Sequence, residues 1–225
     1  MTKLIYLEDM QKLTHEAWIE GVSEAEGKTI IELDQTIFYP QGGGQPYDKG
    51  TIENENGKFV VEEVRFVDGV VKHIGTGHKF QIGEQVVLNV DEPRRKLHMR
   101  LHSGGHVLDM AINKLGLGWK PGKGYHYPDG PYIEYEGDLE ESEKENLRER
   151  IEATANEFIA EGIETTIKFL PDQLVNGKPA RVVLYGDFSV PCGGTHVANL
   201  RDIGRLAIRK ISSKKGLIRV AYQVD

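Results

Sequence analysis

Two short stretches decide how this chain is organised: His102-Ser103-Gly104-Gly105-His106 and Cys192-Gly193-Gly194-Thr195-His196. Each stretch places two good metal ligands four positions apart. Together they supply three imidazoles and one thiolate, a donor set that suits a tetrahedral zinc ion. The sequence therefore predicts that two distant segments of the chain meet around one metal ion.

The first stretch lies in a predicted helix that begins after Asp91 and ends at Gly116. Asp91 is a suitable N-cap, and Pro93 is tolerated in the first turn, where its missing N–H costs nothing. The apolar residues that follow with a roughly helical period are Leu97, Leu101, Leu108, Ile112 and Leu115. The two histidines are one turn apart on this helix, so we expect them on one face.

The residues before this helix predict a small β domain. Residues 4–7 resemble a strand, residues 29–34 alternate like a half-buried strand, and short β segments follow at 50–54, 58–67, 70–74 and 85–90. Asn56-Gly57 and Asp68-Gly69 are typical hairpin turns. Three consecutive glycines precede Gln45 and indicate a loop whose backbone can approach a ligand closely. We expect residues 1–90 to form an antiparallel β-barrel-like domain that carries this glycine-rich loop.

The residues from 91 onward predict an α+β domain that holds both halves of the metal site. The segment 116–131 is rich in glycine, proline and aromatic residues and reads as a loop. A second helix is expected from Asp138 to about Ala160. The strands expected in this domain are 131–136, 165–170, 181–185, 204–211 and 217–224. The predicted fold class is therefore α+β, with domains at 1–90 and 91–225.

Composition and charge limit the possible functions. The chain is 39% hydrophobic and 28% charged, which is ordinary for a folded protein, and Cys192 is its only cysteine. We expect a cytoplasmic protein, with no membrane segment and no obligatory protein partner. The net charge of −7 comes from residues 138–164, where ten acidic residues meet three basic ones. The rest of the chain is neutral, and residues 201–225 carry seven basic residues against two acidic ones, so a basic face is available for phosphates.

Several alternatives to a catalytic metal stay open on sequence grounds. The histidines could be ordinary core or surface residues. His98, one turn earlier, is either a rival or outer-shell ligand or a helix-surface histidine. A zinc protease would need a glutamate where Ser103 stands. A structural zinc is the stronger rival, because four protein ligands close a tetrahedron. Against that rival, we expect the paired glycines of both stretches to leave open space beside the ligands.

Both stretches and their order resemble the AlaX family of free-standing alanyl-tRNA editing proteins, of the medium-length type, and the editing domain of alanyl-tRNA synthetase. Residues 34–39, 43–45 and 48–50 resemble the glycine-rich region of that domain, and Arg94-Arg95 and residues 211–219 fit as well. The match spans nearly the whole chain. One departure is Ser103-Gly104-Gly105, where synthetase domains more often have Thr-Ala and a bulkier residue, which puts details of the pocket in doubt.

The resemblance implies a trans-editing hydrolase that deacylates mischarged alanine tRNA. The expected substrate is Ser-tRNA(Ala), with Gly-tRNA(Ala) second, at the acceptor end of the tRNA. A synthetic site for alanine cannot strongly exclude serine, which adds only a hydroxyl, so a second site that holds this hydroxyl is useful. The implied cofactor is one Zn²⁺ per chain, held by His102, His106, Cys192 and His196. The ion would anchor or polarise the substrate, or activate water.

The residues proposed to touch the substrate come from the glycine-rich loop and its surroundings. Gln45 and Thr36 are candidates for contacts to the aminoacyl group or terminal adenosine, and Gly43 and Gly44 would allow close approach. The alternative for Gln45 is a turn residue that bonds its own loop. Thr195 lies between two ligands, where it would form a hydrogen bond near the metal or support the turn. Gln45 and Thr195 are the candidates for catalytic residues.

For the tRNA backbone we expect basic residues, Arg219 among them, to contact phosphates, with ordinary surface charge as the alternative. The other candidates are Arg94, Arg95, Lys96, Arg100, Arg205, Arg209, Lys210, Lys214 and Lys215. Two other functions remain possible: a zinc-containing tRNA- or RNA-binding module without activity, and a metal-dependent hydrolase of small esters or amides.

Overall fold

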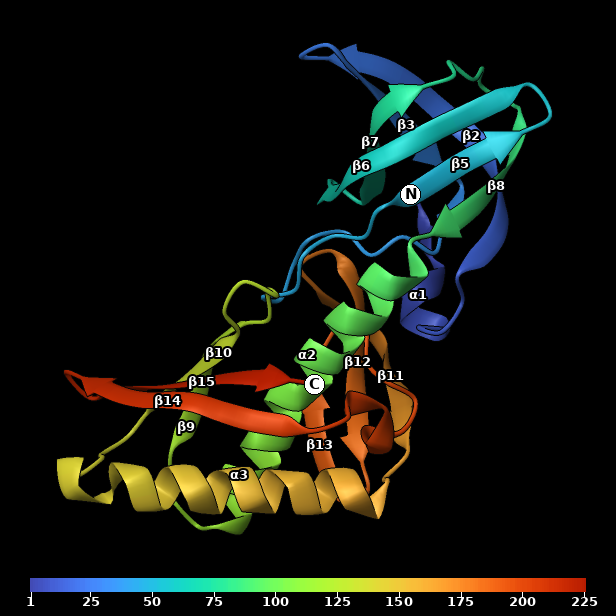
Figure 1. The fold of residues 1–225 in the computed structure, drawn as a ribbon. Helices are drawn as coiled ribbons and strands as arrows, with labels where there is room; N and C mark the ends of the chain where they lie inside the picture. Colours follow the sequence, from blue (N-terminus) through green and yellow to red (C-terminus); the bar gives the residue numbers. More distant parts are fainter.

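A computed structural model describes residues 1–225, and its fold is a mixture of α and β elements (Figure 1). The first part of the chain closes into a six-stranded antiparallel barrel, as the alternating segments predicted. In the order in which they pair around the barrel, the strands are β2 (Thr14–Ala25), β3 (Lys28–Leu33), β7 (Val70–Gly77), β6 (Gly57–Val67), β5 (Gly50–Asn54) and β8 (Gln85–Val90). The barrel has its own core of twenty buried apolar residues.

The extreme N-terminus differs from the prediction. Only β1 (Lys3–Leu4) is a strand, and it pairs in parallel with β4 (Gln35–Thr36). The apolar residues that follow form a single helical turn, α1 (Ile5–Glu8), and three of its four residues are buried. The predicted strand over residues 4–7 is therefore wrong. A run of four apolar residues satisfies a buried turn as well as a buried strand, so periodicity alone did not separate them.

The helix α2 (Glu92–Lys114) leaves the barrel and runs through the second half of the molecule (Figure 1). Its N-cap is Asp91, whose side chain accepts a hydrogen bond from the Arg94 backbone N–H at 3.0 Å. The Asp91 N-cap and the buried apolar residues along the helix confirm the prediction of a helix between Asp91 and Gly116. The acidic helix α3 (Lys144–Glu161) lies across the bottom of Figure 1, preceded by the 3₁₀ turn η1 (Glu141–Glu143). It thus begins six residues later than predicted.

Two sheets complete the second half of the chain. The first has the strand order β14-β15-β10-β9, with β9 (Lys120–Tyr125), β10 (Tyr132–Glu136), β14 (Leu206–Lys214) and β15 (Leu217–Val224). The second has the order β11-β12-β13, with β11 (Thr165–Val175), β12 (Lys178–Tyr185) and β13 (Phe188–Pro191). A second core of twenty-six buried apolar residues packs against α2 and α3.

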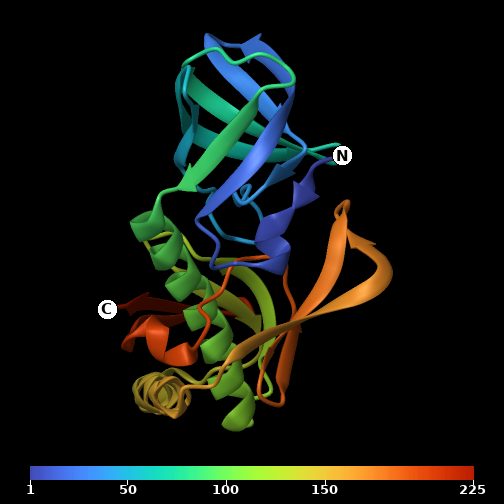
Figure 2. The same ribbon diagram turned by 90° about the vertical axis from the view of Figure 1, so that its right-hand side faces the viewer.

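Several contacts join the barrel to the rest of the molecule. Arg95 of α2 is fully buried and pairs with Asp48, which is also fully buried. The hairpin of β11 and β12 rises toward the lower edge of the barrel in Figure 2. At the turn of this hairpin, the Lys178 ammonium lies 4.8 Å from the centre of the Phe66 ring. None of the helices combines the length and the hydrophobicity that crossing a bilayer requires.

Candidate metal centre

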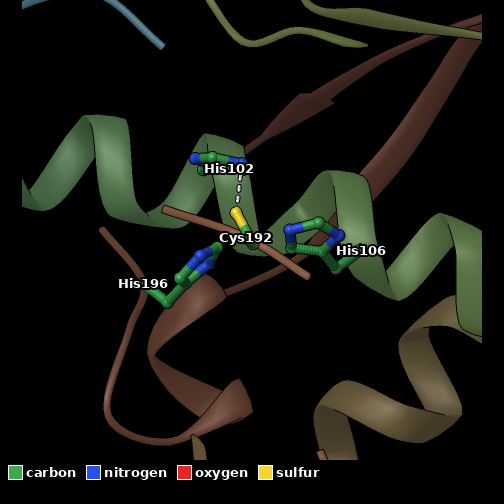
Figure 3. Close-up of side chains that lie close together, drawn as sticks. All are labelled: His102, His106, Cys192 and His196. Carbon is green, nitrogen blue, oxygen red and sulfur yellow. Dashed lines mark hydrogen bonds between the residues drawn. The ribbon is translucent and has the colours of Figure 1, made fainter. Parts of the chain in front are cut away.

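The two sequence stretches meet in the structure. His102 and His106 lie one turn apart on α2, and Cys192 and His196 lie on the loop that follows β13 (Figure 3). One potential ligand atom from each of the four residues lies within 4.8 Å of the others. The three histidines are buried and the cysteine is partly buried. The structure therefore brings the four predicted ligands into one group that could hold a metal ion.

The state of the ring nitrogens indicates that this group suits a metal. Nε2 of His106 and Nε2 of His196 are buried without a hydrogen-bond partner, and Nδ1 of His106 faces only the Asp109 carboxylate, at 3.5 Å. His102 Nε2 meets only the Cys192 sulfur, at 3.4 Å. A buried polar atom without a partner costs about 1–3 kcal/mol, so two such nitrogens at one point would be an unusual loss of stability. An ion bound by three imidazoles and a thiolate would remove that loss.

Gln45 from the glycine-rich loop holds the first of these histidines. Its side-chain carbonyl accepts hydrogen bonds from His102 Nδ1 at 2.8 Å and from the Thr195 backbone N–H at 3.0 Å. Its amide nitrogen donates to the Thr195 hydroxyl at 2.8 Å. Because the Thr195 N–H can only donate, the atom of Gln45 that faces it is the oxygen. The same oxygen faces His102 Nδ1, so Nδ1 carries the proton of this imidazole. The lone pair of Nε2 consequently faces Cys192, as a metal ligand requires.

The other two histidines also have supporting partners. His196 Nδ1 lies 3.0 Å from the Tyr185 hydroxyl and 3.4 Å from Ser103 Oγ. Ser103 in turn accepts a hydrogen bond from the Val197 backbone N–H at 3.1 Å. His106 Nδ1 lies 3.5 Å from a carboxylate oxygen of Asp109. Ser103, which stands where a protease would need glutamate, thus supports the loop that carries His196.

Electrostatics favour the metal-binding forms of three of the four side chains. Burial lowers the pKa of His106, but hydrogen bonds and charge from Asp109 and Cys192 outweigh it and raise this pKa to about 9, so this imidazole must lose a proton to bind a metal. Burial, helped by neighbouring positive charge, holds the pKa values of His102 and His196 well below the usual range, so both imidazoles are neutral at neutral pH. Burial raises the pKa of Cys192, but the hydrogen bond and charge of His106 outweigh it, and the net shift of this pKa is downward. The buried Arg181 guanidinium adds positive charge, and it donates to the backbone carbonyls of Cys192, at 3.0 Å, and Gly194.

The glycines of both stretches mostly serve close packing, not open space. A Cβ on Gly194 would overlap the His102 ring, and one on Gly105 would lie 2.6 Å from the His126 ring. A Cβ on Gly104 would press against Val224 at 3.2 Å. Only at Gly193 does a Cβ meet nothing within 4 Å. The expectation that both glycine pairs leave room beside the ligands is therefore wrong for three of the four glycines.

The remaining predicted site residues lie in different places. Gln45 and Thr195 are fully buried beside His102, and the backbone of Gln45 also bonds Gly42 across the glycine-rich loop. Gly44 packs against β9, where its carbonyl accepts from the His126 backbone N–H at 2.8 Å, whereas a Cβ on Gly43 would meet nothing closer than 3.8 Å. Thr36 is buried in the barrel, and its hydroxyl bonds His73 Nε2 at 2.8 Å.

The predicted basic contacts also separate into different groups. Arg219 lies on β15, where it pairs with Glu134 at 2.6 Å. Arg95 is wholly buried, so the prediction that it contacts phosphate is wrong. Arg100 and Arg209 donate to backbone carbonyls of Ile203 and Tyr222, which occupies part of their hydrogen-bonding capacity. Arg94, Lys96, Arg205, Lys210, Lys214 and Lys215 are at least partly exposed.

His98 fits neither of its two sequence interpretations. It is fully buried, so it is not a helix-surface histidine. It lies outside the group of four potential ligands, and neither of its ring nitrogens has a hydrogen-bond partner, so it does not support a ligand. Sequence reasoning also missed His126, whose ring stacks on His102 with centroids 4.4 Å apart and whose Nδ1 lies 2.7 Å from the Tyr222 hydroxyl. His126 and Arg181 stand alone in the sequence without a motif, so only tertiary contacts could identify them.

Comparisons with known proteins agree with the geometry. Residues 3–94 match the family described as tRNA synthetases class II (A), and residues 180–221 match the threonyl and alanyl tRNA synthetase second additional domain. The alanyl-tRNA editing protein AlaX-M of Pyrococcus horikoshii is 36% identical over 95% of this chain and 93% of its own length. AlaX-M of Saccharolobus solfataricus is 31% identical over 100% of this chain and 99% of its own length.

The chain is also similar to part of a synthetase. The alanine–tRNA ligase of Archaeoglobus fulgidus is 35% identical over 98% of this chain, which spans only 26% of the ligase. Against the two AlaX-M proteins, by contrast, the match runs over nearly the full length of both partners. The chain belongs to the AlaX family of alanyl-tRNA editing proteins.

Proposed function

We propose that the protein is an aminoacyl-tRNA deacylase that acts in trans on mischarged alanine tRNA. Its substrates would be Ser-tRNA(Ala) and, second, Gly-tRNA(Ala), whose aminoacyl ester it would hydrolyse in the cytoplasm. The observation that carries the proposal is the group of four convergent ligands, in which Nε2 of His106 and Nε2 of His196 are buried without a hydrogen-bond partner, in a chain of this family. The names of the relatives support alanyl-tRNA editing as the activity.

The proposed cofactor is one Zn²⁺, held by His102, His106, Cys192 and His196. Three imidazoles and one thiolate suit zinc better than magnesium or calcium, which prefer oxygen ligands. When bound, such an ion supplies positive charge that orients or polarises the ester or activates water. We also propose that residues 1–90 and 91–225 act as two domains, with the glycine-rich loop of the first closing over the ligands of the second.

Gln45 acts in this proposal as a positioning residue. Its carbonyl holds His102 Nδ1 and the Thr195 backbone N–H at the same time, so one side chain fixes a helix ligand relative to the loop that carries the other two ligands. Because Gln45 is fully buried and both ends of its amide have partners, its contribution is to orient His102. Such outer partners commonly change metal affinity by about 10–100-fold.

Thr195 is the residue we propose for contact with the substrate. Its hydroxyl accepts a hydrogen bond from Gln45 Nε2 at 2.8 Å, and no second partner occupies its own proton. The hydroxyl can therefore donate to a substrate oxygen beside the ligands. A site with such a donor favours a seryl group over an alanyl group, since alanine leaves the buried hydroxyl without its partner.

Incubation of the purified protein with serine-charged and alanine-charged tRNA(Ala) tests the proposal. We expect rapid loss of serine and retention of alanine. If neither charged tRNA is deacylated while both still bind, the protein is the second candidate, a tRNA-binding module with a structural zinc, which the closed set of four protein ligands would also allow. Equal hydrolysis of both aminoacyl esters would contradict the proposed selectivity.

A further inference from the structure

Three tyrosines form a stack at the edge of the sheet that covers α2. The Tyr125 ring lies parallel to the Tyr127 ring, with centroids 4.4 Å apart and planes inclined by 18°. On its other side it stacks on Tyr132, at 5.2 Å and 15°. All three tyrosines are partly exposed. We call Tyr125, Tyr127 and Tyr132 the tyrosine stack.

The strand register places this stack on the outer face of the sheet. Ile133 and Tyr135 of β10 are buried in the core, so the alternate residues Tyr132 and Glu134 point to the opposite face. Tyr125 is paired directly with Tyr132 across the strands. The tyrosine stack is therefore attached to a rigid sheet and turned away from the core.

Charged groups of both signs lie at the stack: Asp129 accepts a hydrogen bond from the Tyr125 hydroxyl at 3.1 Å, and Arg219 is paired with Glu134 at 2.6 Å. The Arg219 guanidinium lies over the Tyr132 ring, 4.0 Å from its centre. A second cationic aromatic group lies on the barrel side, where Arg65 and Arg94 each lie 5.6 Å from the centre of the Tyr47 ring.

The stack is directly connected to the metal centre. His126 lies between Tyr125 and Tyr127 in sequence but turns inward, where its ring stacks on the ligand His102 with centroids 4.4 Å apart. Its backbone N–H also bonds Gly44 of the glycine-rich loop at 2.8 Å. The tyrosines therefore lie on the outer face of the sheet, and His126, between two of them in sequence, reaches the metal centre on the inner side.

We propose that the tyrosine stack and its arginines bind the unpaired 3′ end of the tRNA and lead it to the metal centre. Parallel aromatic rings with one open face stack on nucleobases of any sequence, and neighbouring arginines contact the phosphates. An aminoacyl ester sits at the end of such an unpaired strand, so a site for that ester needs a surface of this kind next to it. The identity of the RNA rests on the proposed function, whereas the surface itself does not.

The test measures binding of uncharged RNA, so it does not depend on deacylation. The probe is a fluorescent hairpin that copies the alanine acceptor stem, either with its unpaired 3′ end or with that end removed. The test variants Tyr127→Leu and Tyr132→Leu remove an aromatic ring from the stack. The conservative variants Tyr127→Phe and Tyr132→Phe keep the ring. Phe169→Leu is the control, because it removes an exposed aromatic residue elsewhere in the protein. Melting temperatures establish that each variant is folded.

We expect each leucine variant to raise Kd for the complete hairpin about ten-fold, the gain typical of stacking one base. The phenylalanine variants and Phe169→Leu should stay within about two-fold of the wild type, because they keep the rings of the stack. The shortened hairpin should bind all the proteins equally. The proposal is overturned if the leucine and phenylalanine variants bind alike, or if the leucine variants lose affinity for both hairpins to the same extent.

Other outcomes separate this proposal from the proposed function. A wild type that binds the 3′ end through the stack but deacylates nothing would sink the proposed function and leave this surface standing. If the wild type deacylates Ser-tRNA(Ala) and the leucine variants bind the RNA normally, the proposed function stands and the role of the tyrosine stack is overturned. Sedimentation that shows a dimer lost in Tyr132→Leu, with RNA binding unchanged, would assign the stack to self-association and overturn the proposal.

Discussion

At the scale of single residues, the centre depends on side chains that orient the ligands. We predict that Gln45→Ala lowers zinc affinity by about 10–100-fold, because His102 loses the partner that keeps its proton on Nδ1. Gln45→Glu keeps an acceptor for His102 and for the Thr195 N–H, so it should retain more of the affinity. Competition with a chromophoric chelator measures both variants. Unchanged affinity in Gln45→Ala would show that His102 needs no such partner.

The sequence was informative at this scale where ligands come in pairs. A spacing of four puts His102 and His106 on one helix face, and the only cysteine stands in the same spacing to His196, so all four could be proposed as ligands. The partners of the ligands could not be proposed in the same way. Tyr185 and Arg181 reach the ligand loop from β12, and no local pattern marks them.

At the scale of elements, the glycine-rich loop fits against β9 only because Gly44 has no side chain. Its φ is +75°, and a Cβ there would overlap the Gly124 carbonyl oxygen. We predict that Gly44→Ala lowers the free energy of unfolding by about 3 kcal/mol, from the strained backbone and the displaced strand. Gly43→Ala is the matched control, because φ is +53° but a Cβ has space, and it should cost about 1 kcal/mol.

Urea unfolding measures both glycine variants. If both variants lose the same free energy of unfolding, the loss comes from the backbone conformation alone, and the contact with Gly124 does not contribute. A lower deacylation rate in Gly44→Ala than in Gly43→Ala, at a temperature where both are folded, would further link this contact to the site, since Gly44 also bonds His126.

Elements were predictable where hydrophobic periodicity was strong and were missed where it was weak. The long run of apolar residues and the Asp91 cap marked α2. The strand β9 was assigned to a loop because it contains Pro121 and two glycines. It lies at the edge of its sheet, where proline is tolerated because no neighbour needs its missing N–H. The whole of β2 was missed as well, since only Ala17 and Ile19 of its twelve residues are buried.

At the scale of the whole molecule, a buried ion pair connects the barrel to α2. Arg95 Nε donates to both carboxylate oxygens of Asp48, at 3.1 and 3.0 Å, and the guanidinium also bonds the carbonyls of Met10 and Ile37. Neither side chain of the pair is exposed. We predict that Asp48→Ala costs about 3–5 kcal/mol of stability, because it leaves a buried cation without its partner.

Denaturant unfolding of Asp48→Ala and of Asp48→Ala/Arg95→Met checks this prediction. The double variant removes the uncompensated charge and should recover part of the loss. If Asp48→Ala unfolds at the wild-type midpoint, the ion pair does not contribute to the connection between the barrel and α2. No sequence pattern announced this pair, because its two members are far apart in the chain and each resembles an ordinary surface charge.

The barrel also predicts how stability depends on pH. Burial lowers the pKa of His73 to about 4, and the ring bonds Thr36 and the Ile31 carbonyl as a neutral imidazole. Above about pH 6.5 His73 is neutral in the folded and unfolded chains alike. As the pH falls from there to about 4, only the unfolded chain takes up the proton, so the free energy of unfolding should fall by about 3 kcal/mol.

The comparison with His73→Gln isolates this contribution from that of the other buried histidines. The variant should be less stable at pH 7, where it loses packing, yet its stability should change less between pH 6.5 and 4 than that of the wild type. Urea unfolding at several pH values measures the difference. Parallel pH profiles for the two proteins would show that His73 titrates normally in the folded barrel.

Whether the four ligands hold a zinc ion that the reaction needs is tested by returning zinc to metal-depleted protein and following hydrolysis of Ser-tRNA(Ala) at each addition. We predict that activity is absent after depletion, rises linearly with zinc and stops rising at one equivalent per chain, because four side chains form one group. Cys192→Ala should bind less than one equivalent and stay inactive. Full hydrolysis by the depleted protein, or a Cys192→Ala variant with full zinc and full activity, would contradict the account.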